Sequence, residues 1–503
     1  MHARQRTILL VQPPFYRLYK STYSLDRYPL ALGYLAGAIR RGTSWRVRAY
    51  NADFTPASEP VTLAYRTGAG FQHYRESLRS LDGPVWQEVR AALEETAPSV
   101  VGITAKSQEF AAALNVARLA KARDPRTTVV LGGPHPSMVG AEVLRSPEVD
   151  VYVRGEGERT IVELLRALEE GAPLSGVDGI GYREGGAVVE TAARAYLDDL
   201  DSLDFPHESA PEVLKDHEKY PVEAFRYVFA TRGCPRHCSF CGSHRVWGRH
   251  TRFRSPENVV RELQALQAKG LPAVHFDDDI FGVTRAHVGR LCDAIQAGCP
   301  GLRWSCELHV RQVNDGTIER MRRAGCTSIQ LGIESGRDEI LERIHKHITI
   351  EEALAACRTI KRHGIELHAF FMVGFPWETE ASLRDTISAI GRTRCDTVSY
   401  SIFTPYRGTE AFEVCRELGL VDDGFDLSLC NHQSPANNFC AEIPHERFRE
   451  LVSDVERALD RKHARLRLRR ALSPAGLRAL RARGLAGNLD RALRLLGIRA
   501  PAG

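Results

Sequence analysis

Three cysteines at the spacing C-x3-C-x2-C constrain this chain more than any other feature of its sequence. They are Cys234, Cys238 and Cys241, and they follow a β-type apolar run over residues 226–230. A loop that leaves a strand can wrap three thiolates around one corner of an iron–sulfur cubane. Three thiolates bind three irons of a [4Fe–4S] cluster, so the fourth iron is left open to another ligand.

Two other roles for these cysteines are a zinc knuckle and disulfide bonding. No fourth Cys or His follows at zinc-finger spacing, although His237 and His244 are close enough to be considered. Disulfides would suit a secreted protein, but the apolar run before Pro13 is too short for a signal peptide. No apolar run approaches the ~20 residues that a membrane-spanning helix needs. We therefore expect a cytoplasmic protein with reduced thiols.

Short apolar strands alternate with helices through the first 190 residues. This pattern predicts a doubly wound parallel α/β sheet, whose ligands lie at the carboxyl ends of the strands. Residues 56–84 lack such a pattern and are predicted to be irregular, as a lid or an insertion. The loops at the strand ends contain Pro13-Pro14, residues 104–107, residues 132–136 and residues 155–158. Paired glycines such as Gly132-Gly133 let a bulky ligand lie against the backbone.

The cysteine loop, with Phe240 before its third cysteine, resembles the signature of the radical SAM superfamily. The resemblance implies that the open iron of the cluster binds S-adenosylmethionine and that one electron cleaves it to a 5′-deoxyadenosyl radical. Six strand–helix units follow the loop and suit the partial (β/α)6 barrel of this superfamily. A buried acid at a strand end can instead cap a helix. The implied contacts to S-adenosylmethionine are Phe240, Asp277, Asp279, Glu334, Gly374 and Phe375.

The N-terminal strand ends resemble the first half of cobalamin-dependent radical SAM proteins. The D-x-H-x-x-G motif that supplies a cobalt-ligating histidine is absent, and residues 12–16 (QPPFY) stand in its place. No histidine of this domain is therefore expected to bind cobalt. A flavodoxin-like scaffold that has lost its corrinoid is the alternative, with His135 in a structural role. The implied cobalamin contacts are Pro13, Thr104, Ser107, Gly132, Gly133, Pro134, His135, Gly155 and Glu156.

The two resemblances together imply a methyltransferase similar to the class B radical SAM enzymes. Its cofactors would be a [4Fe–4S] cluster, S-adenosylmethionine and cobalamin, with methylcobalamin supplying the methyl group to a substrate radical. The implied substrate is a small molecule with an unactivated carbon, such as a natural-product intermediate or a lipid. The implied electron donor is a flavodoxin or ferredoxin. Radical rearrangement, cyclisation or ring contraction would leave the same sequence features, and a corrinoid- or redox-sensing binding protein is the alternative outside the enzymes.

The expected division of the chain has four parts. They are a cobalamin-binding domain over residues 1–190, a linker over 191–225, a radical SAM barrel over 226–420 and a helical region over 421–503.

Positive charge is concentrated in the last part of the chain. Residues 461–503 contain twelve Lys or Arg and one acid, a net charge of +11 that leaves −6 on the rest. An Arg-rich helix with a leucine stripe can lie on an anionic membrane, dock on an acidic partner or remain a solvated flank. The tail has no aromatic residue for base stacking, so nucleic-acid binding is not expected. The stripe consists of Leu485, Leu489, Leu493 and Leu496.

Overall fold

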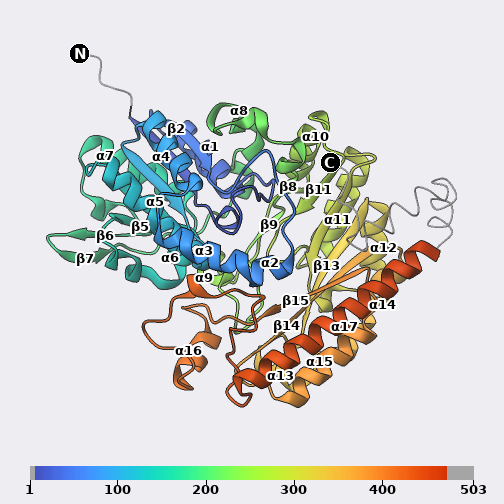
Figure 1. The fold of residues 1–503 in the computed structure, drawn as a ribbon. Coiled ribbons are helices and arrows are strands. Elements are labelled where there is room, and N and C mark those ends of the chain that lie inside the picture. The colour runs from blue at the N-terminus through green and yellow to red at the C-terminus, as the bar shows by residue number, and fades with distance from the viewer. Residues whose placement is uncertain (1–5, 473–503) are drawn as a thin grey trace, which may run out of the picture.

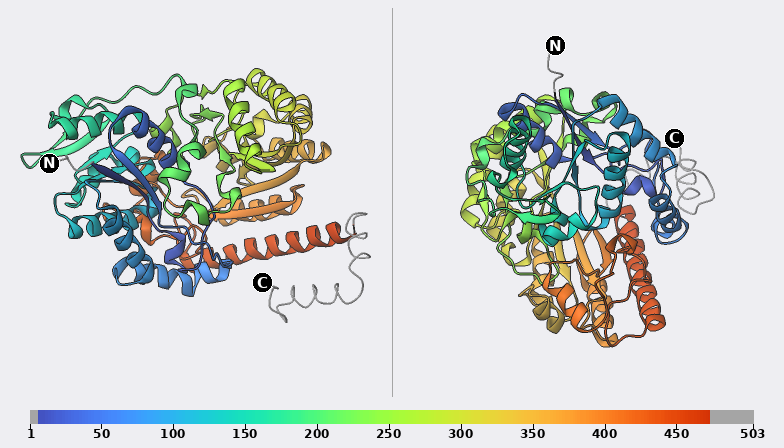
Figure 2. Two further views of the ribbon diagram at one scale, coloured as in Figure 1. Left: turned by 90° about the horizontal axis from the view of Figure 1, so that it is seen from above. Right: turned by 90° about the vertical axis from the view of Figure 1, so that its left-hand side faces the viewer.

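The computed structural model describes residues 6–472, which form two α/β units that lie side by side (Figures 1 and 2). The first unit, blue to cyan in Figure 1, is built on a seven-stranded sheet. The second, green to orange, is built on a six-stranded sheet. The predicted architecture, a doubly wound α/β unit followed by a partial (β/α)6 barrel, is confirmed.

The first sheet has the strand order β2-β1-β3-β4-β5-β6-β7. Its first four pairings are parallel, and β6 and β7 extend the edge as an antiparallel hairpin. The carboxyl ends of β1, β3, β4 and β5 therefore meet at one edge of the sheet. The strands are β1 (Thr7–Gln12), β2 (Arg46–Asn51), β3 (Val100–Thr104), β4 (Thr128–Gly132), β5 (Val151–Val153), β6 (Ile180–Glu184) and β7 (Ala187–Glu190).

Helices bury both faces of this sheet. Ile8 and Leu10 of β1 belong to the core on one face, and Leu9 and Val11 to the core on the other, because successive side chains of a strand point in opposite directions. This explains why the strands are continuously apolar. One face is covered by α1 (Leu30–Gly42), α7 (Glu158–Glu170) and α8 (Pro206–Val213), and the other by α4 (Pro84–Thr96) and α5 (Phe110–Arg123).

The segment predicted to be irregular, residues 56–84, instead contains α2 (Leu63–Thr67) and α3 (Ala69–Arg79). Aromatic packing holds α3 in place, since Tyr74 is buried and stacks on Tyr19 with ring centroids 4.7 Å apart. Only Gly70 and Tyr74 of α3 are buried and no residue of α2 is, so few apolar core positions mark these helices in the sequence.

The second sheet is entirely parallel, with its strands in chain order β8-β11-β12-β13-β14-β15. The expectation of six units after the cysteine loop is wrong by one, because β8 precedes the loop and five strands of this sheet follow it. All six carboxyl ends therefore lie at one mouth of the open barrel. A short antiparallel pair, β9 (Thr231–Arg232) and β10 (Arg252–Phe253), brackets the cysteine loop. The strands of the sheet are β8 (Tyr227–Val228), β11 (Ala273–Phe276), β12 (Arg303–Leu308), β13 (Cys326–Glu334), β14 (Glu366–Val373) and β15 (Thr397–Ile402).

The helices of this unit begin at recognisable caps. Ser255 accepts a hydrogen bond from the Asn258 backbone N–H, and Pro256 occupies the first turn, as predicted from the sequence. The helices between the strands are α9 (Ser243–Trp247), α10 (Pro256–Ala268), α11 (Arg285–Gly298), α12 (Asp315–Arg323), α13 (Asp338–Arg343), α14 (Ile350–Arg362) and α15 (Glu380–Arg392).

The chain after the barrel folds back across it. Helix α16 (Glu410–Glu417) leads into a loop region, and the long α17 (His445–Leu472) packs against α15 and β15 (Figure 1). The predicted helix over residues 446–463 is thus part of a longer one. The leucine stripe of the tail lies outside the described residues. In the described part of the chain, no helix combines the length and apolar character needed to cross a membrane.

Candidate active site

The cysteine loop follows β9 and is anchored by contacts with other segments. Gly233, immediately before Cys234, has φ +94°, and a Cβ there would lie 2.5 Å from the backbone oxygen of His250. Only glycine fits this close approach without strain. Within the loop, the Ser239 N–H donates to the Ile344 carbonyl at 3.0 Å, and the Ser239 carbonyl accepts from the Ala411 N–H at 2.9 Å. The backbone that carries the cysteines is therefore fixed by three separate segments.

The three loop thiols are set apart from most other cysteines of the chain. Cys234, Cys238 and Cys241 are each partly exposed, whereas eight of the other nine are buried. The charges of the three sulfurs also act on one another, so they share one neighbourhood. The described residues contain no group of three His, Cys, Asp or Glu placed to hold a single metal ion. Three neighbouring, accessible thiols without a single-ion geometry fit the corner of a cubane better than a zinc knuckle.

Burial disfavours free thiolates here, while nearby groups counteract it. Burial raises the pKa of Cys234, Cys238 and Cys241, the last to about 12. The Arg236 and Ser243 backbone N–H groups and the Lys346 ammonium act in the opposite direction. A metal cluster, which binds cysteine as thiolate, would complete this arrangement of positive and N–H groups.

Four carboxylates lie at the barrel mouth, at the ends of three neighbouring strands. The predicted residues Asp277, Asp279 and Glu334 are brought together there, since each acts electrostatically on Glu307. Glu307 is exposed at the mouth, and partial desolvation, followed by these three charges, raises its pKa. Glu307 was missed by sequence reasoning, although its place at the end of a predicted strand was a usable signal. This concentration of negative charge suits a cationic ligand such as a sulfonium with an ammonium group.

Two of these acids already have basic partners. Lys346 Nζ donates to Glu334 Oε1 at 2.7 Å, and Arg27 of the first unit forms an ion pair with Asp277. The backbone of Glu334 has φ +71°, an uncommon conformation for a residue with a side chain. Asp278 between the predicted acids is structural, because its Oδ1 accepts the Ala230 and Thr231 N–H groups at 2.9 and 2.7 Å.

The predicted adenine contacts lie next to the cysteine loop. The rings of Phe240 and Phe375 are 5.8 Å apart, and Gly374 turns the chain with φ +94°. The Glu378 side chain holds this turn, since its Oε2 accepts the N–H groups of Gly374 and Phe375 at 2.5 and 3.2 Å.

Glu378 gives the turn a pH-dependent stability. Burial raises its pKa to about 8, against the two backbone hydrogen bonds that favour the carboxylate. The folded protein therefore binds a proton that the unfolded chain has released, and stability falls as pH rises from about 5 to 8. We expect a slope of at most about 1.4 kcal/mol per pH unit in the free energy of unfolding, which Glu378→Gln removes. Urea unfolding at several pH values measures this, and parallel profiles for the two proteins would refute it.

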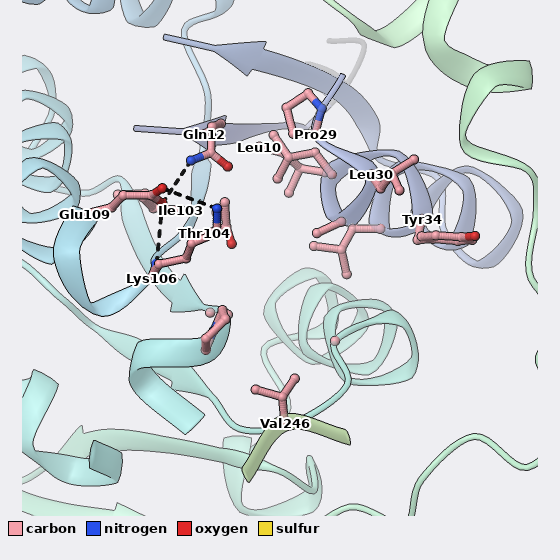
Figure 3. A pocket seen from close by; sticks show the side chains of 18 of the residues that line it. Leu10, Gln12, Pro29, Leu30, Tyr34, Ile103, Thr104, Lys106, Glu109 and Val246 are labelled. Carbon is pink, nitrogen blue, oxygen red and sulfur yellow. Dashed lines mark hydrogen bonds and ion pairs between the residues drawn. The ribbon is translucent and has the colours of Figure 1, made fainter. Parts of the chain in front are cut away.

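A cavity of about 410 Å³ lies between the strand ends of the first unit and the barrel (Figure 3). Near β1 and β3, its wall carries Glu109, whose carboxylate accepts from Gln12 Nε2 at 3.0 Å and pairs with Lys106 Nζ at 3.6 Å (Figure 3). The predicted cobalamin contacts that line the cavity are Thr104, Gly132, Gly133, Pro134, Gly155 and Glu156.

The other three predicted contacts are not among the residues that line this cavity. Pro13 follows β1, and Ser107 and His135 bond to each other at 3.1 Å between Oγ and Nδ1. The His135 ring packs on Phe110 with centroids 4.2 Å apart, and burial lowers its pKa to about 4. His135 therefore packs against Phe110 and Ser107 and is not among the residues that line the cavity.

A buried ion-pair network joins this cavity to the cysteine loop. Arg232, two residues before Cys234, donates to Glu156 at 2.8 Å and to Glu158 at 2.6 Å, and Arg252 donates to Glu156 at 2.7 Å. All four side chains are buried. Sequence reasoning chose Glu156 as a ligand contact but missed both arginines, because their partners lie far away in the chain.

Comparison with known proteins identifies the two units. Residues 16–165 match the B12 binding domain, and residues 228–390 match the Radical SAM superfamily. An uncharacterised methyltransferase of Pyrococcus horikoshii is 30% identical over 410 residues, which cover 81% of this chain and 82% of that protein. The chain belongs to the cobalamin-dependent radical SAM family. Family membership confirms the predicted cofactors: cobalamin, a [4Fe–4S] cluster and S-adenosylmethionine.

A further relative and a solved structure are also similar to this chain. The anaerobic magnesium-protoporphyrin IX monomethyl ester cyclase of Rubrivivax gelatinosus is 29% identical over 361 residues, and the match covers 69% of this chain and 63% of the cyclase. The radical S-adenosylmethionine methyltransferase TsrM from Kitasatospora setae, solved with cobalamin and a [4Fe–4S] cluster, superposes with a TM-score of 0.66. That match has 17% identity and covers 90% of this chain and 89% of that one, so it supports the fold alone.

Proposed function

We propose that this family member is a methyltransferase that moves a methyl group from methylcobalamin to an unactivated carbon of a small molecule. One observation carries the proposal. Asp277 belongs to the acids at the barrel mouth and also lines the larger cavity, so the regions suited to S-adenosylmethionine and to cobalamin share a wall. Two cofactors on opposite sides of one wall can both reach a substrate between them.

In this proposal the chain binds and orients the reactants. Cys234, Cys238 and Cys241 hold the cluster. Asp279 and Glu307 attract the positively charged end of S-adenosylmethionine, while Phe240 and Phe375 pack on its adenine, and Gly374 provides the turn. When bound, the cluster supplies the electron that cleaves S-adenosylmethionine, and cobalamin supplies the methyl group.

The larger cavity would hold cobalamin without a histidine beneath the cobalt. The D-x-H-x-x-G motif is absent, and His135 is engaged with Ser107. Gln12, Lys106 and Glu109 provide polar groups, while Gly133 brings the backbone close.

Several finer points complete the proposal. The division of the chain near residues 190, 225 and 420 places the two cofactors in separate domains. The electron donor is a flavodoxin or ferredoxin, and the basic tail contacts an anionic membrane surface. A cytoplasmic location suits a cluster enzyme, and all twelve cysteines are free.

A cyclisation is the second candidate reaction, because one relative is a cyclase. The two reactions differ in what becomes of S-adenosylmethionine. We expect the anaerobically reconstituted protein, given S-adenosylmethionine, dithionite and cobalamin, to form both 5′-deoxyadenosine and S-adenosylhomocysteine, the second by transfer of the methyl group to the reduced cobalamin. Chromatography with mass detection measures both products. 5′-Deoxyadenosine without S-adenosylhomocysteine would favour cyclisation.

Substitution of Gly133 tests the larger cavity as the cobalamin site. A Cβ on Gly133 would lie 2.8 Å from Thr104 Oγ1 and 3.0 Å from the Ala105 nitrogen, at φ +98°. The added methyl group of Gly133→Ala would displace Thr104 or the loop backbone at the cavity wall, and we expect this to raise the cobalamin Kd roughly 10-fold. Absorbance after desalting measures bound cobalamin.

Gly171→Ala is the matched control. Gly171 also has a positive φ, +68°, but nothing lies within 4 Å of its Cβ position and it is not among the residues lining the cavity. We expect it to bind cobalamin as the wild type does. Equal binding by Gly133→Ala and Gly171→Ala would contradict the assignment.

A further inference from the structure

A second cavity, of about 220 Å³, lies between the first unit and the loop region after the barrel. Its wall combines aromatic side chains with polar groups, namely Phe15, Tyr16, Tyr19, Arg66, Gln108 and residues 430–433. Tyr16 also lines the larger cavity, so the two cavities adjoin at this side chain.

His432 of the cavity wall contacts Tyr406, which follows the last strand of the barrel. His432 Nε2 and the Tyr406 hydroxyl are 3.0 Å apart, and their rings stack with centroids at 5.7 Å. Burial raises the pKa of Tyr406. Because the second cavity adjoins the larger one at Tyr16, a molecule bound in it would lie beside the proposed cobalamin site.

Arg66 carries a positive charge that no carboxylate of the described residues pairs with. Its guanidinium lies 5.5 Å from the ring centroid of Tyr16 and 5.8 Å from that of Tyr19. Its Nε atom is buried and has no hydrogen-bond partner among the described residues. A half-buried guanidinium without an anion is unfavourable, and its planar fork matches a carboxylate or phosphate group.

The remaining polar groups of the wall are neutral or firmly held. Burial and the charge of Arg66 lower the pKa of His432 to about 4, so its ring is uncharged at neutral pH. Arg66 is therefore the one charged side chain among the residues that line this cavity. Its carbonyl accepts from Asn431 Nδ2 at 2.8 Å, which ties α2 to the loop region. The Gln433 Oε1 atom is buried and has no partner among the described residues.

We propose that this cavity binds the substrate and that the substrate is a small organic acid. Its anionic group would pair with Arg66, and its planar or apolar body would lie against Tyr16 and Tyr19. This inference rests on the proposed function only where it calls the bound molecule the substrate. The preference for an anion follows from the residues of the cavity itself.

Two fluorinated probes of the same shape test the preference for an anion. 4-Fluorobenzoate and 4-fluorobenzamide differ in charge, and ¹⁹F NMR titration of the full chain, with hydroxocobalamin present, gives both Kd values. We expect the benzoate to bind at least about 10-fold more tightly than the amide. Arg66→Gln is expected to abolish this ratio, and Tyr16→Leu to weaken both probes.

Arg126→Gln is the control for general loss of positive charge, because Arg126 is exposed and pairs with Asp124 at 3.0 Å. Arg126→Gln should keep the wild-type ratio of the Kd values for the two probes. Equal binding of both probes to the wild type, or an unchanged ratio in Arg66→Gln, would overturn the proposal. Cobalt and iron content of the same wild-type preparation reports separately on the proposed function, so the two can fail independently.

Discussion

Replacement of Cys241 by alanine is expected to remove most of the bound iron and to lower the cleavage of S-adenosylmethionine by roughly 10³-fold or more, because the cofactor carries the chemistry. Cys241 shares its neighbourhood with Cys234 and Cys238, and two remaining thiolates hold a cubane poorly. Cys234→Ala and Cys238→Ala should behave alike. Iron analysis and the rate of 5′-deoxyadenosine formation after anaerobic reconstitution are the measurements.

Cys299→Ala provides the control for loss of a thiol. Cys299 is buried in the barrel core. Within the described residues, the hydrogen-bond partner of its Sγ atom is the Val260 carbonyl, at 3.9 Å. We expect its iron content and rate to equal those of the wild type. A Cys241→Ala protein that retains a full cluster would remove these three cysteines from the mechanism.

Loss of Arg232 should uncouple the two units. Arg232→Met leaves Glu156 and Glu158 buried with fewer partners, and breaking a buried pair from one side costs about 3–5 kcal/mol. Arg232 also lies 4.8 Å from the ring of Trp247, which lines the larger cavity. We expect a lower thermal midpoint together with reduced binding of both cofactors.

Two further variants separate this network from ordinary charge effects. Arg232→Lys has one ammonium in place of the fork that reaches two glutamates, so it should restore only part of the stability. Arg126→Gln removes an exposed pair and should leave the thermal midpoint close to that of the wild type. If Arg232→Met has the same thermal midpoint and binds both cofactors as the wild type does, the network does not hold the two units together.

Local patterns were sufficient to predict which candidate residues lie together within one loop or at neighbouring strand ends. The cysteine spacing is such a pattern, and so are the acids after β11 and β13, because parallel strands bring their carboxyl ends to one mouth. The glycines after β4 were predictable for the same reason. In each case the chemistry and the backbone geometry are set by neighbouring residues.

Interactions between distant segments were not predictable from one sequence. Arg232 and Glu156 meet only once both units have folded, and nothing in the residues around either one indicates the other. The same holds for Arg66, whose helix α2 is positioned by Asn431 from the far end of the chain. His135 was chosen for its place after two glycines, yet the turn directs its ring towards Phe110.

One chain is expected to hold both a cluster and a cobalamin at adjoining sites. Metal analysis of the wild-type protein, purified anaerobically with cobalamin and then reconstituted, measures this. We expect about one cobalt and about four irons per chain. Four irons without cobalt would contradict the methylcobalamin reaction and would leave the larger cavity without its proposed cofactor.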